Sequence, residues 1–504
     1  MINVLDYLNP SLENDPDKTA FADEETQYSF KELDRRLKGT GTALLKRGLK
    51  RRSVLVFMEK SVKEIAAFFG VIAAGCYYVP VDPEMPLSRI QRIVDNCKPG
   101  ICIADSTTFS LAEELDIEGG TALYDEISAE ETDEEALNRV RKEAIDTDPI
   151  YIVFTSGSTG IPKGVAACHR SVIDYIEQLS EVLQVSSETV FGNQAPLYFD
   201  ACLKELYPTL KYGATTYLIP KKLFSLPAKL VAYLNDHKIN TICWVASALT
   251  IVSSLKTFRK IKPEFLKTVA FGSEVFPVKQ YNSWKEACPG ARFINLYGPT
   301  EATGMSCYHV LDRDYEETEA IPVGKPFKNT RLLLIKEDGT EAGKGEEGEI
   351  VLSGTCVTLG YYNDPDRTYK SFVQNPLQNA YPEKVYRTGD LGYLNEDGDL
   401  VFISRRDNQI KHMGHRIELG EIEAAASQTE GAGLNGCIYD EDRGKIILYY
   451  TGDIRETDLI GELKALLPRF MVPNQVYHLE EMMFTANGKI DRNALKKLYE
   501  RNKG

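Results

Sequence analysis

The chain has 504 residues, of which 43% are hydrophobic and 26% charged, a composition typical of a globular protein too long for one hydrophobic core. Its 59 Lys and Arg residues and 74 Asp and Glu residues give a formal net charge of −15. Because no segment rich in Lys and Arg offsets this acidic balance, we do not expect nucleic acid as a partner. No stretch approaches about 18 uninterrupted apolar residues and no signal peptide opens the sequence, so we expect a cytoplasmic protein that does not bind membranes.

Short apolar runs and helical patterns alternate through the early part of the chain. Residues 53–61, SVLVFMEKS, predict a short strand, and residues 61–75, SVKEIAAFFGVIAAG, predict an amphipathic helix that ends at Gly75. Alternation of this kind predicts parallel sheets covered by helices. We therefore expect an α/β protein.

A loop of small and hydroxylated residues follows one predicted strand. The run from Ile150 to Phe154 is β-branched and aromatic without polar alternation, which predicts a strand buried on both faces. The loop offers flexible glycines, hydroxyl groups and one cation, a combination suited to a polyphosphate. Pro162 and Gly164 depart from the Walker pattern, which argues against an ordinary P-loop NTPase. The alternative to a phosphate-binding loop is a flexible linker rich in Ser and Gly. The loop residues concerned are Thr155, Ser156, Gly157, Ser158, Thr159, Gly160 and Lys163.

The segment TSGSTGIPKG resembles the phosphate loop of the adenylate-forming superfamily, which comprises acyl-CoA synthetases, luciferases and the amino-acid-activating adenylation domains of peptide synthetases. Further motifs between Tyr28 and Lys489 resemble the same family in the same order. The resemblance implies a large N-terminal domain of parallel and mixed sheets with covering helices, residues 1–406, and a small mobile C-terminal α+β domain, residues 407–504. It also implies ATP as a substrate and Mg²⁺ as a cofactor.

Four later motifs resemble the ATP-binding segments of the family. TVAFGSEVFP and FINLYGPTEATG resemble the segments beside adenine and phosphate, YRTGDL the segment that binds the ribose, and SRRDNQIK the segment that contains the domain hinge. The implied ATP-binding residues are Gly272, Ser273, Asn295, Tyr297, Gly298, Thr300, Asp390 and Arg405, with Glu301 as the Mg²⁺ ligand and Asp407 as the hinge. Lys489 matches the lysine that contacts both the substrate carboxylate and the bridging phosphate oxygen, and it forms the implied catalytic set with Lys163 and Thr300.

The segment GNQAPLYFDACLKELYPTL contains Asp200, for which the local pattern and the family resemblance predict different roles. Pattern alone makes Asp200 the N-cap of the helix that follows. In amino-acid-activating members the acid after this Phe pairs with the substrate α-ammonium, and Asp200 matches it. Because a buried carboxylate without a cation is costly, this second interpretation predicts an amino acid as the substrate.

The rest of the implied substrate pocket is apolar apart from one cation. Lys204 lies four residues after Asp200, so both side chains should project from one face of the helix. Two interpretations stay open: Lys204 pairs with a protein acid such as Glu205 or extends to the surface, or it binds a carboxylate on the substrate side chain. By motif alignment the lining residues are Ala201, Lys204, Cys243, Val269, Phe271, Leu296, Gly304 and Met305.

The resemblance implies two half-reactions. A substrate carboxylate attacks the α-phosphorus of ATP to give aminoacyl-AMP and pyrophosphate, and a phosphopantetheine thiol then accepts the acyl group. The sequence has no segment like LGGxS, so we expect the thiol on a separate carrier protein and the enzyme itself as a monomer.

Three other functions stay open. A D-alanine–carrier protein ligase of teichoic acid modification is one, although Gly272 stands where those ligases place a cysteine. An acyl-CoA ligase for a non-amino carboxylic acid would dispense with Asp200. A non-catalytic nucleotide-binding protein would be expected to lack Lys489 or Glu301, and both are present.

Overall fold

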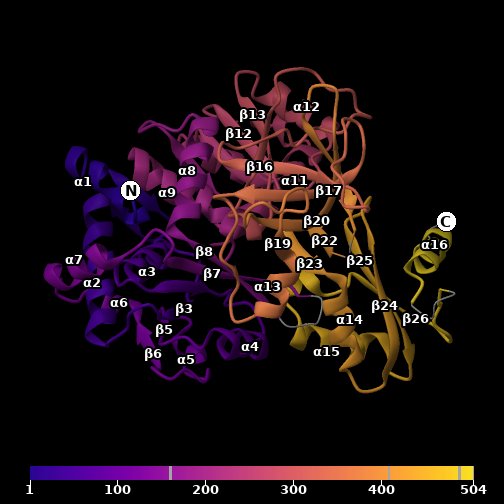
Figure 1. Cartoon of the computed structure of the whole chain (residues 1–504), viewed down its shortest axis with the longest axis horizontal. Helices are drawn as coiled ribbons and strands as arrows, with labels where there is room; N and C mark the ends of the chain where they lie inside the picture. The colour runs from indigo at the N-terminus through magenta and orange to yellow at the C-terminus, as the bar shows by residue number, and fades with distance from the viewer. Residues whose placement is uncertain (158–161, 407–408, 486–489, 503–504) are drawn as a thin grey trace. The chain divides into compact units, whose positions relative to one another are not determined.

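The computed structural model describes residues 1–157, 162–406, 409–485 and 490–502, and the chain divides into two compact units. The first unit contains residues 1–83, 97–154 and 164–406, and the second contains residues 84–96, 155–163 and 407–504. Figure 1 labels many of their helices and strands. Of the residues introduced above, Ser158, Thr159, Gly160, Asp407 and Lys489 lie outside the described ones.

The largest sheet of the first unit has nine strands. Its centre, from β1 to β13, is parallel, and antiparallel strands β2, β14 and β15 complete its two edges. Every residue of β12 is buried, as expected for a strand covered on both faces. In spatial order the strands are β15 (Lys325–Pro326), β14 (Cys307–Val310), β13 (Arg292–Tyr297), β12 (Thr268–Gly272), β11 (Thr241–Val245), β9 (Val190–Asn193), β10 (Thr215–Leu218), β1 (Thr19–Ala22) and β2 (Gln27–Ser29).

A seven-stranded sheet in the first unit contains the strand predicted before the phosphate loop. That strand is β7, and every residue after Pro149 is buried, which confirms the prediction. The predicted strand and helix at 53–75 are also present, as β3 and α3, and the Ser61 hydroxyl caps α3 by accepting the N–H of Glu64. In spatial order the strands are β18 (Gly360–Tyr361), β8 (Lys163–Cys168), β7 (Pro149–Thr155), β4 (Tyr77–Pro80), β3 (Ser53–Phe57), β5 (Cys102–Ala104) and β6 (Thr121–Leu123).

A third, antiparallel sheet completes the strands of the first unit. It consists of β16 (Thr330–Ile335), β17 (Gly348–Gly354), β20 (Lys384–Leu394), β19 (Phe372–Gln374) and β21 (Leu400–Arg405), and β20 pairs with β21. This pairing matters for the site because it sets Asp390 opposite Arg405.

Helices cover both faces of the nine-stranded sheet. One apolar cluster joins that sheet to α2, α3, α8, α9 and the seven-stranded sheet, and a second lies on its other face under α10, α11 and α12. Helices on both faces of parallel sheets confirm the predicted α/β class. The helices are α1 (Asn9–Asn14), α2 (Phe30–Lys46), α3 (Val62–Ala73), α5 (Phe109–Ala112), α6 (Tyr124–Ile127), α7 (Glu134–Glu143), α8 (His169–Leu183), α9 (Leu203–Tyr212), α10 (Pro227–Asp236), α11 (Ala246–Ser254), α12 (Val278–Ala287) and α13 (Pro365–Ser371).

The second unit is smaller and mixes helices with two short sheets. Its apolar core contains Ile417, Ile422, Leu448 and Leu463. Its elements are α4 (Leu87–Cys97, which extends one residue into the first unit), β22 (Gln409–His412), β23 (His415–Glu418), α14 (Leu419–Ser427), β24 (Ala432–Asp440), β25 (Lys445–Gly452), α15 (Glu456–Leu466), β26 (Gln475–His478) and α16 (Arg492–Asn502).

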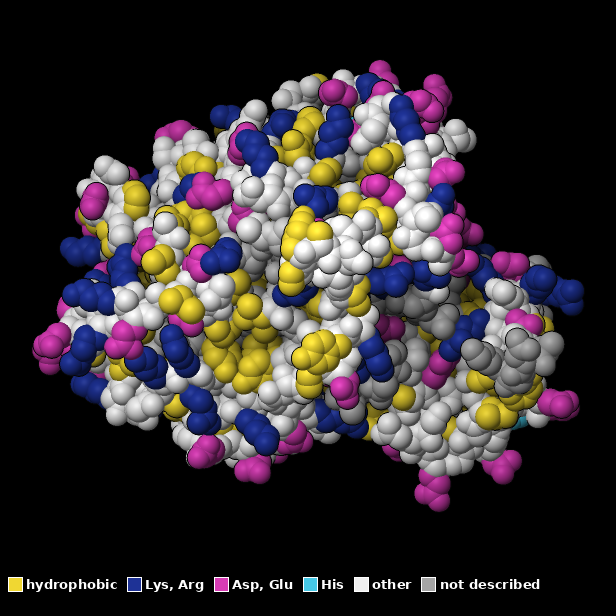
Figure 2. Space-filling view, in the orientation of Figure 1, with side chains coloured by type: hydrophobic (Ala, Val, Ile, Leu, Met, Phe, Trp, Pro, Cys, Tyr) yellow, Lys and Arg dark blue, Asp and Glu magenta, His cyan; other side chains and the backbone are white. Residues whose placement is uncertain are grey.

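The charged surface is mixed. Lys and Arg side chains lie interspersed with Asp and Glu side chains over the face that Figure 2 shows. Among the described residues no helix is both long and apolar enough to cross a membrane.

Candidate active site

Asp200 opens η2 (Asp200–Cys202), a 3₁₀ turn that leads into α9. Phe199 precedes η2 and Cys202 precedes α9, and neither position contributes a side-chain cap. Asp200 is therefore not an N-cap, and the interpretation from pattern alone is wrong. The carboxylate lies within the turn, where another role must account for its burial.

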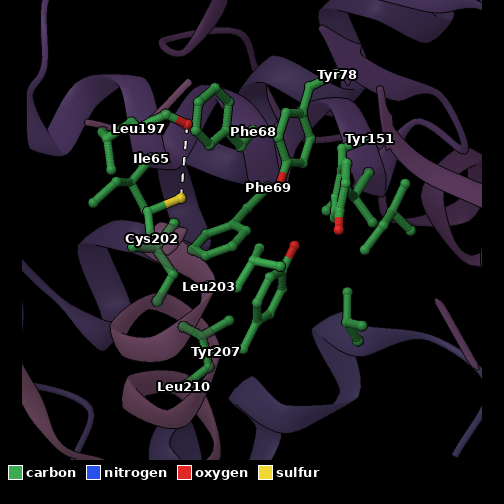
Figure 3. Close-up of a cluster of buried hydrophobic side chains, with 14 of the residues drawn as sticks. Ile65, Phe68, Phe69, Tyr78, Tyr151, Leu197, Cys202, Leu203, Tyr207 and Leu210 are labelled. Atoms are coloured by element: carbon green, nitrogen blue, oxygen red, sulfur yellow. Dashed lines mark hydrogen bonds between the residues drawn. The ribbon is translucent and has the colours of Figure 1, made fainter. Parts of the chain in front are cut away.

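Apolar packing holds α9 in place. Leu203, Leu206 and Leu210 are fully buried on it, and each contributes roughly 1.5–3 kcal/mol by leaving water. Figure 3 shows this helix beside α3, and the rings of Phe69 and Tyr207 lie 5.8 Å apart at their centroids. The start of α9, with its charged residues, is thus anchored to the core.

Asp200 is a buried carboxylate, and one of its two oxygens lacks a hydrogen-bond partner among the described residues. It is only 9% exposed, and the oxygen concerned is Oδ2. Burial raises its pKa, whereas the charge of Lys204 and the polar groups of Thr300 and Gly304 act in the opposite direction. A bound cation would stabilise the charged form of Asp200, so the site suits an ammonium group.

Three neighbouring parallel strands, β11, β12 and β13, carry the apolar lining. Cys243 pairs with Ala270, and Gly272 pairs with Leu296. Cys243, Ala270 and Leu296 all belong to the cluster that contains the apolar residues of α9, and Ala201 packs against the same cluster. These positions therefore share the sheet face that meets Asp200 and Lys204.

Val269 and Phe271 lie on the other face of the sheet. They belong to the cluster of Trp244, and the rings of Phe271 and Phe276 are 4.6 Å apart at their centroids. The expectation that these two residues line the same pocket as Cys243 is wrong. Neighbouring residues of a strand point to opposite faces, so a shift of one residue in a motif exchanges the face of every side chain. Ala270 and Gly272 occupy the positions instead.

Gly304 and Met305 complete this face after η5 (Thr300–Ala302). A Cβ on Gly304 would lie 2.8 Å from the ring of Tyr175, so the glycine allows that ring to stand close to the backbone. Met305 and Tyr175 are buried in the same cluster. Tyr175 was not recognised from the sequence, where the helical pattern of α8 indicated only packing.

Lys204 is buried in this apolar setting. It is 5% exposed, so its ammonium does not extend to the surface. Among the residues that the structure describes, it forms no ion pair with a carboxylate, Glu205 included. Its charge nevertheless acts to lower the pKa values of Asp200 and Glu205, so it lies near both. Neither pairing with Glu205 nor exposure is observed.

Asp390 and Arg405, the implied ribose-binding residues, form one connected group with Tyr297, which the resemblance places beside adenine. The Tyr297 hydroxyl donates a hydrogen bond to Asp390 Oδ2, 2.5 Å away, and Arg405 forms an ion pair with the other oxygen. Asp390 is 2% exposed, and its own N–H donates to the hydroxyl of Thr388. A carboxylate has about four acceptor positions, so Asp390 keeps capacity for further donors such as ribose hydroxyls.

Glu301 is fully buried on η5, and the hydroxyl of Tyr361 donates to its Oε1 at 2.8 Å. No cluster of three His, Cys, Asp or Glu that could hold a metal occurs within the described part of the chain. A single hard carboxylate ligand suits Mg²⁺, which commonly binds through one or two carboxylates together with substrate phosphates. Glu301 therefore fits the implied role of a Mg²⁺ ligand.

The described part of the phosphate loop belongs to the second unit. Thr155 ends β7 and is buried, and its hydroxyl has no partner among the described residues. The Ser156 hydroxyl donates to the backbone oxygen of Arg416, 2.7 Å away in the same unit. Gly157 is also buried, and Lys163 begins β8 with 9% of its surface exposed.

The remaining implied ATP-binding residues lie in or just after the last residues of β12 and β13. Ser273 adopts a left-handed backbone conformation with φ of 68°, directly after Gly272. The Asn295 amide donates to the backbone oxygen of Pro322 at 2.8 Å. This hydrogen bond joins β13 to the segment that precedes β15. Gly298 lies in the turn after β13, and Thr300 begins η5.

Comparison with known proteins shows what the chain is similar to. The AMP-binding enzyme family matches residues 8–362. The L-proline–[L-prolyl-carrier protein] ligase of Pseudomonas fluorescens is 30% identical over 514 residues, covering 97% of this chain and 98% of that protein. Tyrocidine synthase 1 of Brevibacillus parabrevis is 32% identical over 486 residues, covering 95% of this chain, which spans 43% of the length of that synthase.

A solved structure shares the fold. The Vibrio cholerae adenylation domain AlmE, in complex with glycyl-adenosine-5'-phosphate, matches with a TM-score of 0.85 at 20% identity, covering 99% of this chain and 98% of that one. The family match extends over more than half of the sequence, and the proline ligase matches along nearly its whole length. The chain therefore belongs to the AMP-binding enzyme family.

Proposed function

We propose that the chain is an ATP-dependent ligase that converts an amino acid to aminoacyl-AMP and then transfers it to the phosphopantetheine thiol of a separate carrier protein. The observation that supports an amino acid as the substrate is the burial of Asp200. One oxygen of its carboxylate has no hydrogen-bond partner among the described residues. An α-ammonium would satisfy that oxygen and offset the cost of burial. The full-length likeness to a stand-alone prolyl-carrier protein ligase supports the separate carrier.

Positioning and charge neutralisation account for the first half-reaction. The substrate carboxylate attacks the α-phosphorus of ATP, and the proposed residues at the phosphates are Lys163, Thr300 and Lys489. Mg²⁺ at Glu301 would reduce the charge of the phosphate oxygens. For thiol transfer we propose that the segment beginning at Asp407 rotates and presents a different face.

An acidic amino acid is the proposed substrate. Lys204 is buried and has no carboxylate ion pair among the described residues, and a side-chain carboxylate would supply one. Asp200 and Lys204 lie one helical turn apart, so they can address the α-ammonium and the side chain of one molecule.

ATP–pyrophosphate exchange with the twenty amino acids tests this proposal. We expect the highest activity with aspartate or glutamate, and we expect Lys204→Met to lower kcat/KM for that acid by about 100-fold because the buried carboxylate loses its partner. Lys211→Met is the matched control, since Lys211 lies on the same helix and pairs with Glu177. A preference for alanine or a large apolar amino acid would contradict the proposed acidic substrate, and Lys204 would then have only a structural role.

D-Alanine is less well supported as the substrate. A Cβ on Gly272 would lie 2.4 Å from the backbone oxygen of Leu296, so a cysteine here, as in the D-alanine ligases, requires the strands to move apart. D-Alanine belongs in the exchange panel as the direct comparison. An acyl-CoA ligase would instead accept acids without an amino group, which the same panel detects when fatty and aryl acids are added.

The ribose assignment makes a separate prediction. Asp390→Asn should raise KM for ATP about tenfold or more with little change in KM for the amino acid, because an amide accepts fewer hydrogen bonds than a carboxylate. Tyr297→Phe is the control that removes one donor to Asp390 but keeps its charge. Thermal unfolding of both variants separates loss of fold from loss of binding. An unchanged KM for ATP in Asp390→Asn contradicts the assignment.

A further inference from the structure

A second carboxyl group lies beside the proposed substrate pocket. Glu205 follows Lys204 on α9 and is fully buried. The Asn193 amide donates to its Oε2 at 3.3 Å, whereas its Oε1 has no hydrogen-bond partner among the described residues. Glu205 is therefore less well stabilised than a buried carboxylate ordinarily is.

A second cation that acts on Glu205, Lys60, is already engaged with the backbone. The Lys60 ammonium donates to the carbonyl oxygens of Asn193 and Gln194, at 3.3 and 3.2 Å, where β9 ends. Its charge acts to lower the pKa of Glu205, but less than that of Lys204 does. Lys60 thus holds the backbone beside Glu205 without forming an ion pair with it among the described contacts.

Burial is the largest influence on Glu205 and raises its pKa to about 7. The charges of Lys204 and Lys60 and the Asn193 hydrogen bond act against that rise. Since the pKa is raised, the group holds its proton below about pH 7 and loses it above. The titratable groups that face it are Lys204 on α9, Lys60 before α3, Cys202 in η2, Cys243 on β11 and Tyr175 on α8.

We propose that Glu205 determines whether Lys204 is available to a carboxylate on the substrate side chain. When Glu205 is protonated, the carboxylate that remains near Lys204 is Asp200, which the substrate α-ammonium occupies in the proposed complex, so the buried ammonium accepts an acidic side chain. When Glu205 is ionised, it neutralises Lys204 itself and repels a second carboxylate. Glu205 is a positioning residue in this scheme, and the inference rests on the proposed activation of an acidic amino acid.

Proton uptake follows from this arrangement. Two carboxylates beside one buried ammonium cannot both be stabilised, so binding of an acidic side chain favours transfer of a proton from solvent to Glu205. The charge of the pocket is then unchanged by binding: one ammonium gains one carboxylate, and Glu205 becomes neutral. A neutral side chain would bind without this uptake.

The pH dependence of KM tests the inference. In exchange assays with L-glutamate or L-aspartate at saturating ATP, KM should rise about fourfold between pH 6 and pH 7.5, the increase expected when the binding form carries one proton with a pKa of about 7. The substrate carboxylates stay ionised over this range because their pKa values lie near 4. Glu205→Gln imitates the protonated group, so its KM should stay flat. Glu188→Gln, which alters an exposed side chain, is the control, and its KM should rise with pH as the KM of the parent does.

Calorimetry gives a readout that needs no variant. Binding of the same acid to the parent with an unreactive ATP analogue, measured at pH 7 in two buffers of different ionisation enthalpy, should show uptake of about half a proton per molecule bound. Glu205→Gln should show none if it folds. A purely structural Glu205 would leave uptake absent in the parent and the KM slope equal in parent and Glu205→Gln, and either result overturns the inference.

The two proposals fail in different ways. Activation of acidic amino acids with a pH-independent KM and no proton uptake overturns the role of Glu205 and leaves the proposed substrate class intact. No activation of acidic amino acids anywhere between pH 6 and pH 7.5 overturns the substrate class, and the role of Glu205 with it.

Discussion

Asp200→Asn is expected to lower kcat/KM for the amino acid in ATP–pyrophosphate exchange by about 100-fold or more. The substitution keeps the size of the side chain but removes the charge, so the substrate ammonium is left in a buried site without a counter-ion, at a cost of about 3 kcal/mol. ATP does not require this carboxylate for its own binding, and KM for ATP should change by less than about twofold.

The control for Asp200→Asn is Asp236→Asn, an exposed carboxylate at the end of α10, which should behave as the parent. Thermal unfolding provides a second check with a defined sign. Because burial raises the pKa of Asp200, its ionised form is destabilising in the unliganded protein, and removing the charge should not lower the unfolding temperature at neutral pH. If Asp200→Asn activates amino acids as well as the parent does, the α-ammonium assignment is wrong.

Lys489→Ala is expected to lower adenylation by about 100-fold or more while largely keeping thiol transfer from preformed aminoacyl-AMP. Lys489 lies outside the described residues, and the prediction follows from its match to the lysine that contacts the carboxylate and the α-phosphate in related enzymes. Loss of a contact made mainly in the transition state lowers the rate of the step that needs it and leaves the other step nearly unchanged.

Lys163→Ala is the comparison for Lys489→Ala. Lys163 begins β8, next to a loop whose backbone N–H groups remain in the variant, so its loss should be milder. Pyrophosphate exchange measures the first half-reaction, and release of AMP from purified aminoacyl-AMP with a thiol measures the second. Small and equal effects of the two substitutions on exchange would contradict the distinct role of Lys489.

The sequence by itself determined the local parts of this protein. An uninterrupted β-branched and aromatic run can be stable only when both faces are covered, so β7 was predictable from composition. The spacing of Asp200 and Lys204 predicted that the two side chains lie close together, and they do, although Asp200 belongs to the 3₁₀ turn η2 and Lys204 to α9. Local sequence also indicated α3, because its apolar residues recur at the helical period and Ser61 supplies a cap.

Only the tertiary structure decided which side chains meet. The register between β11, β12 and β13 placed Ala270 and Gly272, rather than Val269 and Phe271, on the face of Cys243 and Leu296. A motif aligned without its neighbours can slip by one residue, and in a strand that slip exchanges the two faces.

The charges of the site depended on the tertiary structure even more strongly. Lys60 and Asn193 come from separate strand ends, yet both influence Glu205, and no local pattern in the sequence connects them. Whether a carboxyl group keeps its proton depends on how fully it is buried and on which charges surround it. Those quantities belong to the packed molecule, because residues distant along the chain become neighbours only when the sheets and helices assemble.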